Sequence, residues 1–187
     1  MYGYVKVGSA VPKLRVADCV YNKEEILKLV EAAAAKQVRV LSFPELSVTG
    51  YTCADLFFQA PLLHAAEQAI QEIAEATEAL NIFLLIGAPI AVDNQMFNCA
   101  VALYKGKLLG IVPKTHIPNY SEFYEERWFA SADDLLTEEI TYAGQNVPIG
   151  ADLIFAAADF PALKIGVEIC EDLWVPIPPS SYLSLYG

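Results

Sequence analysis

The chain has 187 residues, of which 55% are hydrophobic, and this is enough to bury a core in one domain. Twelve basic residues against 23 acidic ones give a net charge of −11, which argues against nucleic acids and anionic membranes as partners. The longest apolar run, residues 82 to 92, is too short to cross a bilayer, and no signal peptide is recognised. We therefore expect a soluble, cytoplasmic protein.

The cysteines and histidines form no recognisable metal or disulfide pattern. The four cysteines stand far apart, at Cys19, Cys53, Cys99 and Cys170. Neither His64 nor His116 has a partner at metal-ligand spacing, so we predict no metal site. Reduced thiols are expected in a cytoplasmic chain of this size.

The first elements are expected to be a strand, a helix and a second strand. Residues 2 to 10 alternate in character and predict the first strand. Asn22 is expected to cap a helix, with Glu25 completing a capping box. Residues 38 to 43 predict a second strand, which Pro44 ends because proline cannot donate to a ladder. This order favours a layered α/β protein.

A long helix and several strands are expected next. Apolar residues at helical spacing predict a helix over residues 61 to 80. Residues 83 to 86 predict a buried strand, ended by Gly87 and Pro89. Residues 98 to 112 predict a two-strand hairpin closed by a glycine-containing turn.

The last third of the chain is less regular. Residues 118 to 129 are aromatic and acidic and predict a short helix, whereas residues 132 to 149 predict an irregular excursion. Residues 152 to 156 and 162 to 170 predict a second hairpin, and residues 174 to 187 are rich in proline.

Three polar residues are expected at the ends of three different strands. Glu45 follows the second strand, Lys114 follows the first hairpin, and Cys170 ends the apolar run before it. Taken alone, each has an ordinary explanation. The glutamate and the lysine can be solvated, and the cysteine can lie in the core, since free cysteine is among the most buried residue types. The combination of the three predicts a functional site.

The three side chains have complementary chemistry for attack on a carbonyl or nitrile carbon. Glu45 can take the thiol proton if burial makes its carboxylate more basic. The amides of the turn that follows Cys170 are expected to lower the pKa of the thiol. Lys114 and the amide of Glu171 can stabilise the charge that develops on the substrate. No histidine serves as base, so a papain-like arrangement is disfavoured.

These residues stand in motifs that resemble those of the nitrilase superfamily of carbon–nitrogen hydrolases. The motifs are Phe43-Pro44-Glu45-Leu46 with Thr49-Gly50-Tyr51, then Pro113-Lys114, and then Gly166-Val167-Glu168-Ile169-Cys170-Glu171-Asp172-Leu173-Trp174. Residues 50 to 57 and 113 to 125 are similar, more narrowly, to the glutaminase domains of glutamine-dependent NAD synthetases. The likeness covers nearly the whole chain.

The resemblance implies an αββα sandwich and the hydrolysis of glutamine to glutamate and ammonia through a thioester. Glu45 would be the general base, Lys114 the charge-stabilising cation and Cys170 the nucleophile. No cofactor or metal is implied for this reaction. The alternatives are another nitrilase-type amidase and a non-catalytic fragment of one.

Substrate-binding and supporting residues are also implied by the resemblance. Tyr120 and Glu171 would bind the glutamine, the latter also through its backbone amide. Glu122, eight residues after Lys114, matches a second glutamate near the triad. Tyr51 is expected to support the site.

The resemblance further implies that residues 1 to 187 are one C-terminally truncated glutaminase domain, because Gly187 follows Cys170 by only 17 residues. The implied partner is a synthetase domain, absent from this chain, that would use ATP and Mg to amidate deamidated NAD with the ammonia. A homo-oligomer is expected, and missing strands would leave an apolar edge that favours association.

Overall fold

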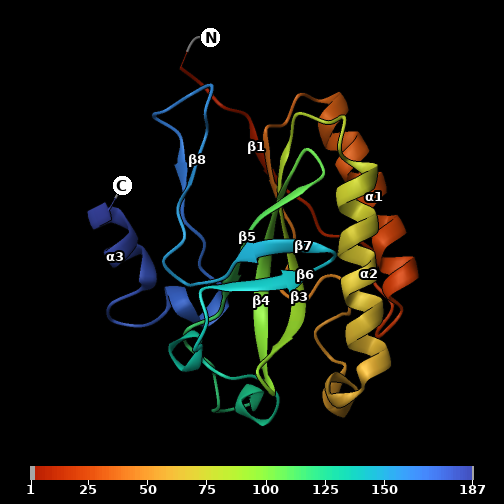
Figure 1. The fold of residues 1–187 in the computed structure, drawn as a ribbon, viewed down its shortest axis with the longest axis vertical. Helices are drawn as coiled ribbons and strands as arrows, with labels where there is room; N and C mark the ends of the chain where they lie inside the picture. Colours follow the sequence, from red (N-terminus) through yellow and green to blue (C-terminus); the bar gives the residue numbers. More distant parts are fainter. Residues whose placement is uncertain (1–2, 187) are drawn as a thin grey trace.

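The computed structural model describes residues 3–186, which are built around a central five-stranded sheet (Figure 1). Residue 2, the expected start of the first strand, lies outside the described residues. In spatial order the strands are β1 (Val7–Ser9), β2 (Val40–Ser42), β3 (Phe83–Val92), β4 (Gln95–Tyr104) and β5 (Lys107–Pro113). The first three run parallel, and β4 and β5 continue the sheet as antiparallel neighbours.

The helix α1 (Cys19–Ala35) connects β1 to β2 and begins earlier than predicted. Its cap is Asp18, whose Oδ1 accepts a hydrogen bond from the Tyr21 amide at 3.0 Å. Asn22 is instead buried inside the first turn, where Nδ2 donates to the carbonyls of Arg15 and Val48 at 2.9 Å each. The predicted cap at Asn22 is wrong, because this side chain ties the helix to two loops.

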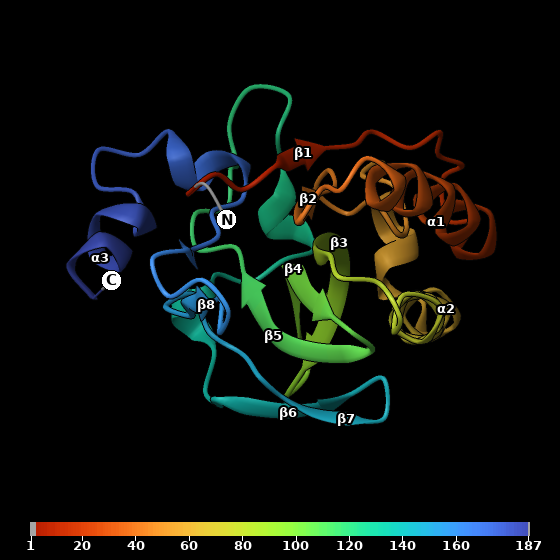
Figure 2. The same cartoon turned by 90° about the horizontal axis from the view of Figure 1, so that it is seen from above.

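The helix α2 (Ala60–Ala76) connects β2 to β3 and confirms the predicted long helix. It packs against α1, and together the two helices cover one face of the sheet (Figure 2). Parallel strands require such crossover connections, and helices are the usual solution. Between β2 and α2 lies a single turn, η1 (Ala54–Phe58).

The strand β3 is longer than the sequence indicates, because neither Gly87 nor Pro89 ends it. Pairing with β4 continues to Val92, with Pro89 opposite Asn98. The carbonyls of Leu85 and Gly87 accept hydrogen bonds from the chain that follows β2. Pro89 lies two residues beyond Gly87, so its nitrogen points to the same side of β3 as the Gly87 carbonyl. β2 has already ended at this level, so the missing N–H of Pro89 costs the sheet no hydrogen bond.

The predicted hairpin of β4 and β5 is confirmed, but the last third contains more structure than the sequence predicts. Residues 132 to 149 include η3 (Ala132–Asp134) and a second hairpin, β6 (Glu139–Tyr142) and β7 (Gln145–Pro148). This hairpin joins β5 through a bridge between Ile111 and Ile149. Where a short helix was expected, only the turn η2 (Glu125–Arg127) forms.

The segment that carries Cys170 is the least regular part. The predicted pair of strands exists but is reduced to β8 (Phe155–Ala156) and β9 (Lys164–Ile165). The turn η4 (Cys170–Leu173) follows, and the proline-rich end folds as the helix α3 (Pro179–Tyr186).

The two faces of the sheet are covered unequally. Helices α1 and α2 bury one face in a large apolar core, to which β3 and β4 contribute alternate side chains such as Ile86 and Val101. On the opposite face a small cluster, Ala100, Val112, Val167 and Ile169, packs the chain before Cys170 against β4 and β5. The mixed α/β class with a central sheet is confirmed.

Within residues 3–186, no helix combines the length and apolarity needed to cross a membrane.

Candidate active site

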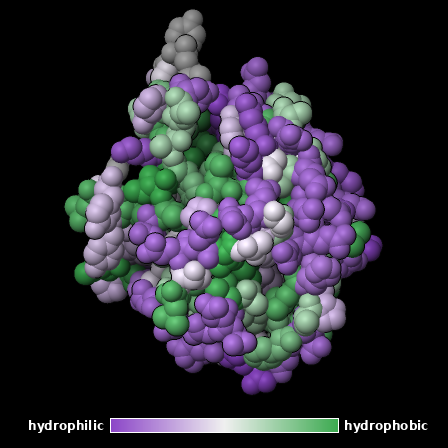
Figure 3. All heavy atoms as spheres, in the orientation of Figure 1, coloured by the Kyte–Doolittle hydropathy of each residue, from purple (hydrophilic) through white to green (hydrophobic). Residues whose placement is uncertain are grey.

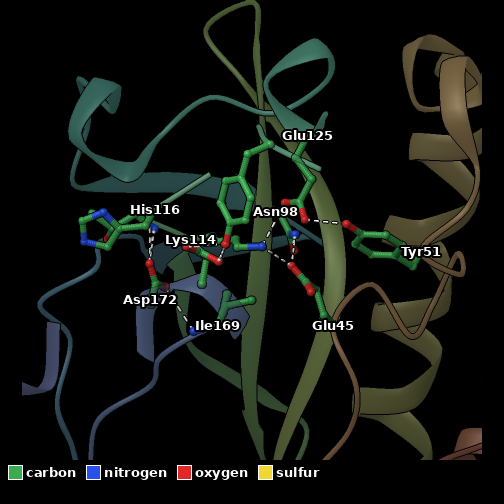
Figure 4. Close-up of polar contacts among 11 residues, drawn as sticks. Glu45, Tyr51, Asn98, Lys114, His116, Glu125, Ile169 and Asp172 are labelled. Atoms are coloured by element: carbon green, nitrogen blue, oxygen red, sulfur yellow. Dashed lines mark hydrogen bonds and ion pairs between the residues drawn. The ribbon is translucent and has the colours of Figure 1, made fainter. Parts of the chain in front are cut away.

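The strand directions bring Glu45, Asn98 and Lys114 to the same end of the sheet. Because β5 is antiparallel to β4, and β4 to β3, β5 runs parallel to β2. Glu45 and Lys114 therefore follow the carboxyl ends of two co-directional strands. Asn98 lies near the amino end of the intervening β4, at the same edge. Figure 4 shows the three side chains converging.

The turn that carries Glu45 lies directly on β3. A Cβ at Gly87 would stand 2.3 Å from the Leu46 nitrogen and 2.6 Å from the Pro44 carbonyl oxygen, closer than real contacts allow. Leu46, fully buried, has a φ of 52°, in the left-handed region that L-residues avoid. Gly87 is thus needed for close approach of two backbones, and it positions Glu45 rather than ending a strand.

Lys114 is fully buried and forms two ion pairs. Its Nζ lies 2.7 Å from Oε1 of Glu45 and 2.9 Å from Oε2 of Glu125. Burial by itself would lower the pKa of Lys114, but the charges and hydrogen bonds of the two carboxylates outweigh it and raise the pKa. The lysine is therefore a fixed cation in the protein interior. It stands at the end of β5 as expected, and the alternative that it is a solvated side chain is wrong.

Glu125, and not Glu122, is the second glutamate beside the lysine. Glu122 is exposed, whereas the side chain of Glu125 is buried and its Oε1 accepts a hydrogen bond from the Tyr51 hydroxyl at 2.6 Å. Burial and this hydrogen bond raise the pKa of Tyr51. Three positions separate the two glutamates, and the turn η2 directs only the later one inward. Tyr51, for which a supporting role is expected, thus contacts the buried Glu125.

Cys170 begins the turn η4 with a φ of 50°, again in the left-handed region. It is exposed, and it lines a cavity of about 160 Å³ together with Glu45. The residue as a whole is exposed, but partial desolvation of its thiol and the negative charge of Glu45 raise the pKa of Cys170, while Lys114 and the amide of Glu171 lower it by less. The amide of Glu171 thus lowers the pKa of the thiol, as expected, but the net direction of the shift is upward.

Asp172 ties the cysteine turn to the lysine loop. Its Oδ1 accepts hydrogen bonds from the amides of Thr115 and His116 at 3.1 and 2.7 Å, and its Oδ2 accepts one from the Ile169 amide at 3.1 Å (Figure 4). Burial raises the pKa of Asp172, and these hydrogen bonds offset part of the shift. One carboxylate thus joins the segments on either side of the reacting groups.

The two predicted substrate residues lie together. The Tyr120 hydroxyl hydrogen-bonds both carboxylate oxygens of Glu171, at 2.9 and 2.8 Å, and this contact raises the pKa of the tyrosine. Both residues line a cleft of about 950 Å³. This larger cleft does not include the catalytic candidates, so we place the chemistry at the smaller cavity that Glu45 and Cys170 share. Among residues 3–186, no group of three or more His, Cys, Asp or Glu side chains could hold a metal.

Three functional candidates are absent from the sequence-based set: Asn98, Glu125 and Asp172. Asp172 stands inside the cysteine motif, and Glu125 inside the aromatic acidic segment, so local signals existed for both. Asn98 had none, because its role depends on pairing between β3, β4 and β5.

Comparison with known proteins identifies relatives across almost the whole chain. The model of the carbon-nitrogen hydrolase family matches residues 6–179. A glutamine-dependent NAD(+) synthetase from Mycobacterium leprae is 38% identical over 185 residues, which are 99% of this chain and 27% of the relative. Its counterpart from Rattus norvegicus is 32% identical over 193 residues, 94% of this chain and 26% of that protein. The chain thus spans about a quarter of the length of these curated relatives.

Solved structures show the same relationship. A glutamine-dependent NAD(+) synthetase from Cytophaga hutchinsonii superposes with a TM-score of 0.81 at 30% identity, covering 89% of this chain and 28% of that one. An amidase from Nesterenkonia sp. AN1 superposes with a TM-score of 0.65 at 16% identity, covering 90% of this chain and 59% of that one. The second likeness concerns the fold alone.

Proposed function

The chain belongs to the carbon-nitrogen hydrolase family, and from this premise we propose that it is the glutamine-hydrolysing part of a glutamine-dependent NAD synthetase. The observation that carries the proposal is the buried pairing of Lys114 with Glu45 and Glu125, beside the cavity that Glu45 and Cys170 line. The similarity to NAD synthetases extends over 99% of the chain and supports glutamine as the substrate.

In the proposed reaction the thiol of Cys170 attacks the side-chain amide carbon of glutamine. Glu45 accepts the thiol proton as the S–C bond forms, which suits a cysteine whose pKa is raised. The charge on the amide oxygen is stabilised by Lys114 and by the amide of Glu171. Glu45 then returns the proton to the leaving nitrogen, ammonia departs, and a thioester remains.

A water molecule completes the cycle. Glu45 takes a proton from the water as it attacks the thioester carbon, glutamate leaves, and the proton returns to the sulfur of Cys170. The same carboxylate thus acts twice, and no cofactor is required for either half. Tyr120 and Glu171, at the edge of the larger cleft, would bind the amino-acid end of the substrate.

The ammonia would be used by a synthetase domain in the same protein, in an ATP- and Mg-dependent amidation of deamidated NAD. This partner is supported by the relatives, of which the chain covers about a quarter. The residues described above would then supply ammonia only.

The proposal is tested with the protein at its full natural length, by measuring glutamate release and NAD formation with glutamine or free ammonia as nitrogen source. Cys170→Ala should abolish both glutamine-dependent activities and leave ammonia-dependent NAD formation intact. Glu45→Gln should lower glutamine turnover by roughly 10²- to 10⁴-fold, the usual worth of a general base. Wild-type protein that hydrolyses simple amides but not glutamine would contradict the proposal and favour a different amidase activity.

A further inference from the structure

Asn98 contacts both members of the central ion pair. It lies on β4 with only 1% of its surface exposed. Its side-chain Nδ2 donates to Oε1 of Glu45 at 2.5 Å, and its backbone carbonyl accepts the Lys114 amide at 2.8 Å. No other described residue is bonded to the glutamate side chain and to the lysine backbone at once.

The hydrogen bonds to Glu45 are distributed asymmetrically between its two oxygens. Oε1 accepts hydrogen bonds from Lys114 Nζ, at 2.7 Å, and from Asn98 Nδ2. Within residues 3–186, the Glu45 carboxylate accepts no other hydrogen bond. Two donors on one oxygen restrain the position of Oε1. The other oxygen, Oε2, keeps its lone pairs for a proton.

The orientation of the Asn98 amide is determined by charge. Its Oδ1 is buried and has no hydrogen-bond partner among the described residues, which is an unfavourable state for a polar atom. Rotating the amide would place Oδ1 against the Glu45 carboxylate, where two acceptors would repel each other. The donor is therefore held towards Glu45 although this leaves an acceptor unsatisfied.

We propose that Asn98 is a positioning residue for the general base: it immobilises Oε1 of Glu45 so that Oε2 is presented to the thiol of Cys170. This inference rests on the proposed hydrolase function. Asn98 does not touch the reacting atoms and acts only through Glu45. In general, a hydrogen bond from a neutral donor stabilises the charged form of a carboxylate.

The same reasoning predicts a pH signature. The charged and titratable groups around Glu45 are Lys114 at the end of β5, Glu125 in η2, Tyr51 after β2 and Cys170 in η4. Substitution of Asn98 leaves all of these in place and removes one donor. Activity on the acid side should therefore be lost at a higher pH than in the wild type.

The test uses Asn98→Leu, which keeps the branched shape and the number of side-chain heavy atoms but removes the donor, and Asn98→Asp, which places a second carboxylate beside Glu45. For Asn98→Leu we expect kcat to fall on the order of 10²-fold with KM changed little, since misplacing a reacting group costs about that much. The acid limb of the kcat/KM profile should move to higher pH in both variants, and further in Asn98→Asp, where like charges share a proton.

A matched control separates positioning from stability. Leu103→Ala, on the same strand and on the side of the helices, creates a cavity in the large core and should lower stability without moving the acid limb. Tyr142→Phe removes a buried hydroxyl that, like Oδ1 of Asn98, lacks a partner among the described residues, and it should change neither activity nor pH profile.

A second readout does not depend on turnover. The rate at which iodoacetamide alkylates Cys170 should show a changed pH dependence in both Asn98 variants, because Glu45 is displaced from the thiol. If the wild type hydrolyses glutamine and both variants keep its kcat, pH limb and alkylation profile, the inference is overturned. If the wild type itself is inactive on amides, but substitution of Asn98 still changes the pH dependence of Cys170 alkylation, the proposed function fails and the positioning role stands.

Discussion

The two halves of the candidate site are built in opposite ways. On the base side, Lys114 and Glu125 are almost completely buried, and Glu45 has only 16% of its side chain exposed. On the nucleophile side, Cys170 is exposed, and Trp174 close behind it is 74% exposed. The charges proposed to act on the reaction are therefore fixed in the protein interior at one end of the sheet, whereas the proposed nucleophile is carried on a surface turn.

The base side of the site is also packed more extensively than the nucleophile side. Strands β2 to β5 are supported by the large core under α1 and α2, but the chain that leads to Cys170 rests on a cluster of four buried side chains. Hydrophilic side chains cover the α1 and α2 side of the molecule, while hydrophobic atoms are gathered on the opposite side, near α3 (Figure 3). The more extensively packed half is therefore the one that holds Glu45, Lys114 and Glu125. Charges fixed in advance need not be reoriented during the proposed reaction, which would be costly.

Replacing Lys114 by Met should give the largest effect, because it removes the cation shared by two buried carboxylates. We expect a loss of about 3–5 kcal/mol in the free energy of unfolding, as found when one partner of a buried ion pair is removed, together with loss of turnover. Denaturant unfolding measures the change, and Lys28→Met, at an exposed pair with Glu25, serves as the control. Equal stability of the two variants would refute the buried-pair argument.

Gly87→Ala tests the contact between the Glu45 turn and β3. The added methyl group must displace backbone atoms of residues 44 to 46, and overpacking of this kind costs about 1–3 kcal/mol. Glutamine turnover should fall as well, since Glu45 moves with the turn. Gly8→Ala is the matched control, because the nearest atom there is a leucine side-chain methyl at 3.4 Å. Similar stability and turnover for both variants would show that the turn adapts freely.

Asp172→Asn tests the corresponding link on the nucleophile side. An amide group can accept at only one of its two positions, so at least one of the three backbone donors now bonded to Asp172 would face an NH₂ group. We expect a loss of about 1–3 kcal/mol, the usual range for a buried donor left unsatisfied. Hydrogen exchange of the Ile169 and His116 amides should increase in the variant. Unchanged protection would show that η4 is held mainly by the small apolar cluster.

The smallest expected effect is a shift in the alkylation profile of Cys170. Because burial and the charge of Glu45 raise its pKa, the reaction rate should still increase as the pH passes the ordinary thiol value of 9.0. Glu45→Gln removes the negative charge and should move the midpoint to lower pH. Buried Cys99 should react more slowly than Cys170 in the folded protein. A plateau below pH 8 in the wild type would show that the thiolate is already formed at rest.

Much of the architecture follows from local patterns in the sequence. Helical spacing identifies α2, glycine at a tight turn identifies the hairpin of β4 and β5, and the motifs around Glu45, Lys114 and Cys170 identify the catalytic candidates. These features depend on residues that are close in the chain, where periodicity and turn chemistry act directly.

The remaining features depend on which segments meet. Glu45 is 69 residues from Lys114 and 53 from Asn98, so their shared hydrogen bonds arise only from the order and register of β2 to β5. The same register places Gly87, where a strand end was expected, against the turn that carries Glu45. The turn η2 buries Glu125, whereas Glu122 remains exposed. The raised pKa of Cys170 likewise depends on partial desolvation of the thiol and on Glu45, a carboxylate that is distant in the sequence but close in space. Local sequence patterns establish which chemical groups are present and on which elements they stand. Their partners follow only from the tertiary structure, because hydrogen bonds and burial depend on distances in space rather than along the chain.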